Sequence, residues 1–347
     1  MTVPNVAGMH EGLLETLRER VRVEPVILSA KAGMGALDIA LHVDEDNYYL
    51  LDPVAVGGDS RVLIHKLTRQ VIEGLQPLPV EALRDPGREG DAARLNLARY
   101  YEGDTQEALH AALELPGSGW TLTRALRSAD REPLLIVCDA HRLPTYLLWE
   151  LRELAGSRVR LLMLTHDGAP RALNDAEAPF YGNSVWIEMP TLSLPVWMVK
   201  LEDEVQVQQE SLQEMLGQVR YRTAAALEVL GRAEDGELQI PLAFAWFQAV
   251  DARMGEARLL AGIAENIHEL APRLLLALAI GQAPYAAMPD ERSDRIALAL
   301  RRLQGHDLVE QPAKREWQVS DPLMSAALAR LQGHKNAVEF YPRAQSI

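Results

Sequence analysis

Short runs that are apolar at every position alternate with helical patterns through the first 190 residues of the chain. The apolar runs lie at 26–30, 48–51, 133–138, 159–164 and, more weakly, 184–188. Helical spacing is readable at 9–21, 59–75, 105–115, 121–129 and 144–155. Continuous apolar strands alternating with helices are typical of a parallel sheet that helices cover on both faces. The pattern therefore predicts an α/β domain over residues 1–190.

Strand signals stop after residue 190. Helical patterns follow at 194–230, 240–254, 256–270, 271–281 and 293–304. Two short strands at 308–311 and 317–320 then flank a turn, and helices followed by such a hairpin match a winged helix. We expect a helical lid at 191–270, a winged-helix domain at 271–335 and a tail at 336–347.

Composition and charge narrow the function classes. The 347 residues carry 35 Lys and Arg against 49 Asp and Glu, a formal net charge of −14. Proteins that live on nucleic acid usually show a basic footprint, so DNA is disfavoured as a ligand of the whole chain. The lone cysteine, Cys138, excludes a disulfide framework or a Cys-rich zinc module. The chain has no apolar run of eighteen residues and no secretion signal, so we expect a cytoplasmic protein without membrane insertion.

The turn after the first apolar run stands where a phosphate-binding loop belongs, between a strand and a helix. A working loop reads G-x-x-x-x-G-K-[ST], with the lysine on the outer phosphates and the hydroxyl on magnesium. Here the stretch from residue 30 reads A-K-A-G-M-G-A-L, so Ala36 holds the lysine position and Leu37 the hydroxyl position. Lys31, Gly33 and Gly35 remain nucleotide-site candidates beside the alternative of a turn with no ligand.

Two further strand ends carry polar residues. In an active ATPase of this layout a strand ends in an adjacent Asp and Glu, which support magnesium and polarise the attacking water. Here the strand ends C-D-A-H-R-L, and Asp139 is its one carboxylate and a catalytic candidate. The next strand ends in Thr165, which is a candidate contact for a γ-phosphate or, alternatively, a polar cap. His141 and His166 are interpreted as structural, and no metal site is predicted because no cluster has metal-ligand spacing.

The order of these pieces resembles the P-loop ATPases of the AAA+ and STAND groups, particularly prokaryotic ones with a C-terminal winged helix. The resemblance covers roughly residues 8–331 and includes Walker A, Walker B and sensor 1 positions at the three strand ends. The Walker B surroundings are also similar to the ExeA, MuB and TniB group of bacterial AAA+ proteins. The resemblance implies a P-loop NTPase-like domain. The sequence leaves open whether this domain binds ATP or ADP, and Mg²⁺ would bind only together with the nucleotide. Loss of the P-loop lysine, its hydroxyl neighbour and the acidic pair predicts a degenerate ATPase.

The expected winged helix reverses the global charge locally. Residues 291–335 contain eight basic and six acidic residues, a net +2. The candidates for contacting DNA or a protein partner are Arg292, Arg295, Arg302, Lys314 and Arg315. A solvated, mixed-charge helix face explains the same residues.

Three hypotheses remain. The first is a non-catalytic scaffold or regulator with a protein partner and a tendency to form homo-oligomers, as AAA+ relatives do. The second is a DNA-binding regulator that uses the winged helix. The third is an ATPase with unconventional site residues such as Lys31 and Asp139.

Overall fold

The computed structural model of the protein describes residues 4–51, 132–143, 145–155, 159–166, 173, 175–201, 209–233, 242–314 and 316–331. The chain divides into two compact units that alternate along the sequence. We call the first the sheet unit; it comprises Glu11–Ala30 and Ala36–Met189. The second, the helical unit, comprises Met1–His10, Lys31–Gly35 and Pro190–Ile347.

The sheet unit is built on five parallel strands in the order β2-β3-β4-β1-β5. The strands are β1 (Val26–Ala30), β2 (Tyr48–Leu51), β3 (Leu134–Val137), β4 (Arg160–His166) and β5 (Val185–Glu188). Every residue of β3 is buried, as are four of five in β1 and five of seven in β4. A parallel sheet covered on both faces produces strands of this kind. The predicted α/β class and its parallel sheet are confirmed.

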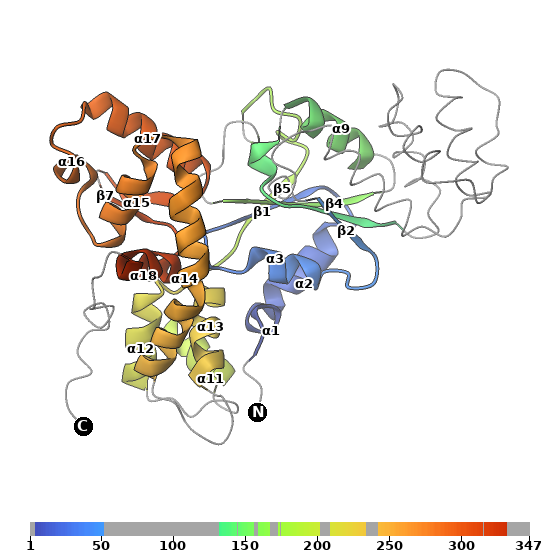
Figure 1. Ribbon diagram of the computed structural model, residues 1–347. Coiled ribbons are helices and arrows are strands. Elements are labelled where there is room, and N and C mark those ends of the chain that lie inside the picture. The colour runs from blue at the N-terminus through green and yellow to red at the C-terminus, as the bar shows by residue number, and fades with distance from the viewer. Residues whose placement is uncertain are drawn as a thin grey trace, which may run out of the picture. The chain divides into compact units, whose positions relative to one another are not determined.

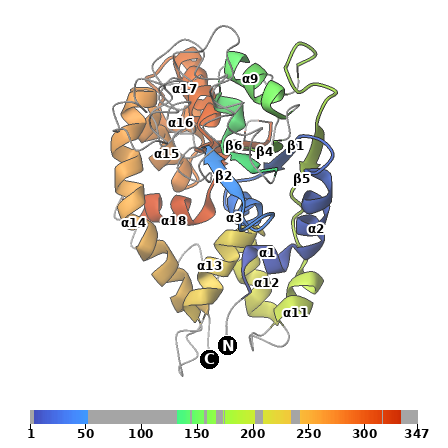
Figure 2. The same ribbon diagram turned by 90° about the vertical axis from the view of Figure 1, so that its right-hand side faces the viewer.

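Helices cover both faces of this sheet. Helices α2 (Glu11–Arg20) and α3 (Ala36–Leu41) lie on one face and α9 (Thr145–Ala155) on the other (Figures 1 and 2). Each helix turns an apolar stripe inward: Leu14 and Leu17 of α2 are buried, and so is Leu148 of α9. The 3-10 turn η2 (Ala140–Arg142) separates β3 from α9.

Short helices precede a long one in the helical unit. They are α1 (Val6–Met9), α11 (Leu194–Leu201), α12 (Gln209–Gln218) and α13 (Thr223–Ala233). The prediction of one continuous helical stretch at 194–230 is therefore wrong, because the stretch is divided into separate helices. Helices α12 and α13 are separated at Arg220 and Tyr221, which both have the left-handed backbone that ends a helix (φ 52° and 55°).

Helix α14 (Leu242–Ile267) is one continuous helix of 26 residues. The prediction of two helices, at 240–254 and 256–270, is wrong because Gly255 does not interrupt it. A glycine inside a helix costs about 1 kcal/mol relative to alanine. Buried Val250 before the glycine and buried Ala257 after it lie on a helix that packs against α13 and α18. This packing outweighs the local preference of glycine.

The last elements of the helical unit are α15 (Ala271–Ala279), α16 (Pro284–Ala287), α17 (Ser293–Gly305), β6 (Val309–Ala313), β7 (Glu316–Val319) and α18 (Pro322–Leu331). The strands β6 and β7 form an antiparallel hairpin, so the two short strands expected here are present. Strand β6 runs further than expected, to Ala313, through a shift of register after Glu310.

The helical patterns expected at 59–75, 105–115 and 121–129 lie outside the described residues. Among the helices that the structure describes, none combines the length and the apolar character needed to cross a membrane.

Candidate functional site

The carboxyl ends of β3, β4 and β1 lie side by side along one edge of the sheet. Ser29 pairs with Thr165 and Ala30 with His166, so β1 and β4 end in register. The segment after β1 leads to β2 and the segment after β4 leads to β5, on opposite sides of this pair. In open α/β sheets, ligands bind at the carboxyl edge where the strand connections diverge in this way. The predicted candidates Asp139 and Thr165 both lie at this edge.

Asp139 follows β3 and takes a left-handed backbone conformation (φ 43°, ψ 44°), which an aspartate adopts more readily than most residues. Its carboxylate lies 3.7 Å from the guanidinium of Arg142, one turn further along η2. Both side chains are partly exposed, so this ion pair contributes little to stability. The segment offers one carboxylate, already facing an arginine, where magnesium-dependent hydrolysis uses an acidic pair.

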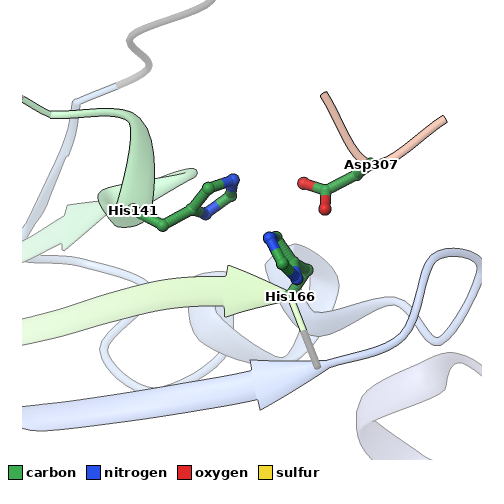
Figure 3. A group of neighbouring side chains, drawn as sticks. All are labelled: His141, His166 and Asp307. Carbon is green, nitrogen blue, oxygen red and sulfur yellow. The ribbon is translucent and has the colours of Figure 1, made fainter. Parts of the chain in front are cut away.

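Thr165 is buried in β4, and its hydroxyl lies 3.3 Å from Nδ1 of His141. The ring of His141 in turn meets the ring of His166 edge to face, with 4.3 Å between their centroids (Figure 3). The structure thus brings one predicted site residue, Thr165, together with two histidines that sequence reasoning set aside as structural. The signal that could have found this pair is that each histidine lies at the end of one of two buried strands or within four residues of it.

The loop Lys31–Gly35 connects β1 to α3. Gly33 and Gly35 both have positive φ angles, 77° and 85°, which glycine adopts without strain. The Met34 amide donates to the Lys31 carbonyl at 3.1 Å, and the Met34 side chain is fully buried. Lys31 is exposed. This loop groups with the helical unit, whereas Asp139 and Thr165 belong to the sheet unit.

Gly33 contacts the amino-terminal end of α13. The Ala225 amide donates to the Gly33 carbonyl at 3.1 Å. Ala225 is the third residue of α13, and the first amides of a helix lack acceptors inside the helix. A Cβ placed on Gly33 would lie 3.3 Å from Cβ of Arg222 and 3.6 Å from Cβ of Ala225. The loop is therefore a docking point for α13, and this contact requires a glycine.

Replacing Gly33 with alanine is expected to lower the free energy of unfolding by about 1–3 kcal/mol, because the new Cβ adds left-handed strain to this crowding. The change is measured by urea denaturation. Gly255→Ala is the matched control: Gly255 is exposed inside α14 with no atom within 4 Å of an added Cβ. It is expected to stabilise by up to about 1 kcal/mol. A Gly33→Ala variant as stable as the wild type would show that the loop does not need this conformation.

Arg222 begins a cluster of charged residues beside the Gly33 contact. It is buried, and its Nη2 donates to both carboxylate oxygens of Glu310 in β6 at 3.0 Å. Arg220 donates to the same carboxylate at 3.3 Å and to the Val319 carbonyl at 2.7 Å. Gln318 donates to it at 2.7 Å. Burial lowers the pKa of Arg220, and the Glu310 carboxylate opposes that effect. Sequence reasoning missed this cluster because its members lie about ninety residues apart.

The described basic residues expected to form a binding surface lie at the start of α17, along it and at the β6–β7 turn. Arg292 forms an ion pair with Asp294 at 2.6 Å. Arg295 forms ion pairs with Glu291, at 2.9 Å, and with Glu269.

Arg302 donates to the Ile267 carbonyl at 3.2 Å, and Lys314 is exposed at the turn. Arg315 lies outside the described residues. The charges of Arg292 and Arg295 are therefore already met by acidic neighbours.

Comparison with known proteins identifies the fold. No protein-family model matches the chain, and no curated protein matches it in sequence. A Walker-type ATPase of Pyrococcus abyssi has a similar structure, with a TM-score of 0.57 at 15% identity, over 92% of this chain and 95% of that chain. The chain therefore has the fold of a Walker-type P-loop ATPase.

Two further solved structures overlap with the chain at lower scores. The ORC1 protein of Aeropyrum pernix, solved in complex with DNA, has a TM-score of 0.48 at 13% identity over 94% of each chain. Cdc6p from Pyrobaculum aerophilum has a TM-score of 0.42 at 14% identity over 96% of each chain.

Proposed function

We propose that the protein is a degenerate ATPase of the AAA+/STAND type that acts as a non-catalytic scaffold or regulatory protein through protein–protein contacts. The observation that carries this proposal is the engagement of the loop Lys31–Gly35 with protein groups. In a working phosphate loop, backbone amides and a lysine converge on the phosphates. Here the Met34 amide is bonded to the Lys31 carbonyl, and Gly33 is packed against α13.

The substitutions at the chemical positions support the same proposal. Ala36 and Leu37 stand where a lysine and a hydroxyl would hold the phosphates and magnesium, and both are apolar. Asp139 lies beside Arg142 and has no acidic neighbour in the segment 138–143. Removing one charge-stabilising group of this sort typically costs orders of magnitude in rate, and here several are absent together.

We further propose that residues 271–335 form a winged-helix domain that serves protein contacts, after a helical lid at 191–270. The hairpin of β6 and β7 after helix α17 supports the assignment. The ion pairs of Arg292 and Arg295 favour a protein partner, because a phosphate backbone would have to displace their carboxylates. The exposed Lys314 at the hairpin turn favours the DNA-binding alternative.

A thermal-shift titration with ATP and ADP, each with and without Mg²⁺, tests the proposal. A ligand that binds only the folded state stabilises it by about 2.7 kcal/mol at 100 times its Kd. We expect no shift with either nucleotide at millimolar concentration. A magnesium-dependent shift that Lys31→Ala abolishes would contradict the proposal and establish the ATP-binding alternative, with Lys31 in the phosphate site.

A further inference from the structure

Two imidazole rings meet edge to face at the carboxyl edge of the sheet (Figure 3). His141 lies in η2, four residues after the end of β3, and His166 is the last residue of β4. The two strands are neighbours, so their ends bring the rings together from positions 25 residues apart in sequence. The ring planes stand at 81° to each other. Neither histidine was expected to have a partner of this kind.

The nitrogens of these rings are placed for a shared ligand. A ring nitrogen of His141 and one of His166 lie within 4.8 Å of each other. Two nitrogens bound to one tetrahedral zinc ion, each about 2.0–2.1 Å from it, stand roughly 3.3 Å apart. A rotation of the rings about their side-chain torsions covers the remaining difference. We propose that His141 and His166 bind a divalent transition-metal ion of the zinc or nickel class.

Imidazole nitrogen selects the class of ion. Zinc, copper and nickel favour imidazole, whereas magnesium and calcium favour carboxylate, carbonyl and water oxygens. The proposed ion is therefore distinct in chemistry from the magnesium of an active nucleotide site. Two protein ligands leave coordination positions for water or for an oxygen of an incoming molecule, as in zinc sites that keep an open position.

Thr165 supplies a hydrogen-bonding group for the second ring nitrogen of one of the two histidines. Metal-binding histidines almost always place their second ring nitrogen against a hydrogen-bonding group that fixes the ring and its tautomer. The buried Thr165 hydroxyl lies 3.3 Å from Nδ1 of His141, which makes Nε2 the coordinating nitrogen. Both histidines are half-buried, and Nε2 of His141 is itself shielded from solvent.

Zinc titration of the full-length protein, freed of any affinity tag, tests this site by isothermal calorimetry. We expect one high-affinity zinc ion among the nine histidines of the chain. His141→Ala and His166→Ala should each weaken its binding by more than about tenfold, and the double variant should abolish it. The matched control is His42→Ala, in the same unit, which should bind zinc as the wild type does. Zinc X-ray absorption should count two imidazole ligands.

Three results would overturn the proposal. The first is a wild-type protein that takes up no zinc. The second is unchanged zinc affinity in the double variant, and the third is equal weakening in His42→Ala. Thermal melting of each variant without metal distinguishes a lost site from a lost fold, and His141→Gln with His166→Gln repeats the test with polar side chains. Because the test uses zinc and no nucleotide, its outcome is independent of the nucleotide titration.

Discussion

Replacing Glu310 with alanine is expected to lower the free energy of unfolding by about 3 kcal/mol. The carboxylate of Glu310 accepts hydrogen bonds from both Arg222 and Arg220, and Arg222 is buried. Removing one partner of a buried ion pair leaves the other charge without compensation, which typically costs about 3–5 kcal/mol. Glu310 is about a quarter exposed, which places the expected loss at the lower end of that range.

Urea denaturation of the full chain measures this loss. Glu316→Ala is the matched control, since it removes the same charge from an exposed position in the same hairpin and is expected to change stability by less than about 0.5 kcal/mol. The double variant Arg222→Met with Glu310→Met should recover part of the loss, because two apolar side chains replace both charges. Equal effects of Glu310→Ala and Glu316→Ala would show that the ion pair adds nothing.

Lowering the pH from 7 to 5 is expected to remove about 2 kcal/mol of stability through His10 alone. His10 is buried, with Nε2 2.9 Å from the Thr223 hydroxyl. Burial lowers the pKa of His10 from 6.5 to about 4, and the positive charge of Lys200 contributes to the shift. The unfolded chain therefore takes up the proton more readily than the folded chain.

The sign of the effect follows from this order of affinities for the proton. Above pH 6.5 the ring is neutral in both states, and the folded protein has its full stability. As the pH falls from 6.5 to 4 the unfolded state is protonated first, so the folded state loses stability, up to about 3 kcal/mol in all. Below pH 4 both states carry the proton and the loss is complete.

His10→Gln should reduce the fall in stability between pH 7 and pH 5 by about 2 kcal/mol relative to the wild type. The comparison uses urea denaturation at both pH values, because the other titrating groups are common to the two proteins and cancel in the difference. His42→Gln is the control for the loss of a histidine outside this buried contact. The same slope in all three proteins would mean that His10 titrates normally in the folded state.

The sequence predicts the sheet well because each strand carries its own signal. Strands such as Val26–Ala30 and Leu134–Val137 are apolar throughout, and burial on both faces requires that composition. The helix boundaries were less predictable. Gly255 predicted a break in the helix, but the packing of α14 keeps the helix continuous. The residue type of Arg220 did not predict the left-handed backbone that separates α12 from α13. Local preference is a weak guide where tertiary contacts decide.

The candidate site could be predicted only in part, for a related reason. Asp139 and Thr165 were found because each directly follows or ends a recognisable strand. The pairing of His141 with His166 depends on which strands are neighbours, and the pairing of Arg222 with Glu310 joins residues 88 positions apart. A single sequence does not show which strands and loops are neighbours in space, so neither pairing can be predicted from it. Gly33 was a nucleotide-site candidate beside the alternative of a turn with no ligand, and the sequence alone does not show that its carbonyl accepts a hydrogen bond from the amide of Ala225.

The contact between His10 and Thr223 also has a consequence for biosynthesis. The two residues are 213 positions apart, and they join the first helix of the chain to α13 of the same unit. A ribosome adds about 5–20 residues per second, so the amino-terminal segment is made roughly 10–40 s before its partner. During that interval the apolar side chains of Val6 and Met9, buried in the finished unit, have no helix α13 to pack against. The segment that holds Val6 and Met9 can thus be fixed in place only after α13 has been made, although it is synthesised more than two hundred residues earlier.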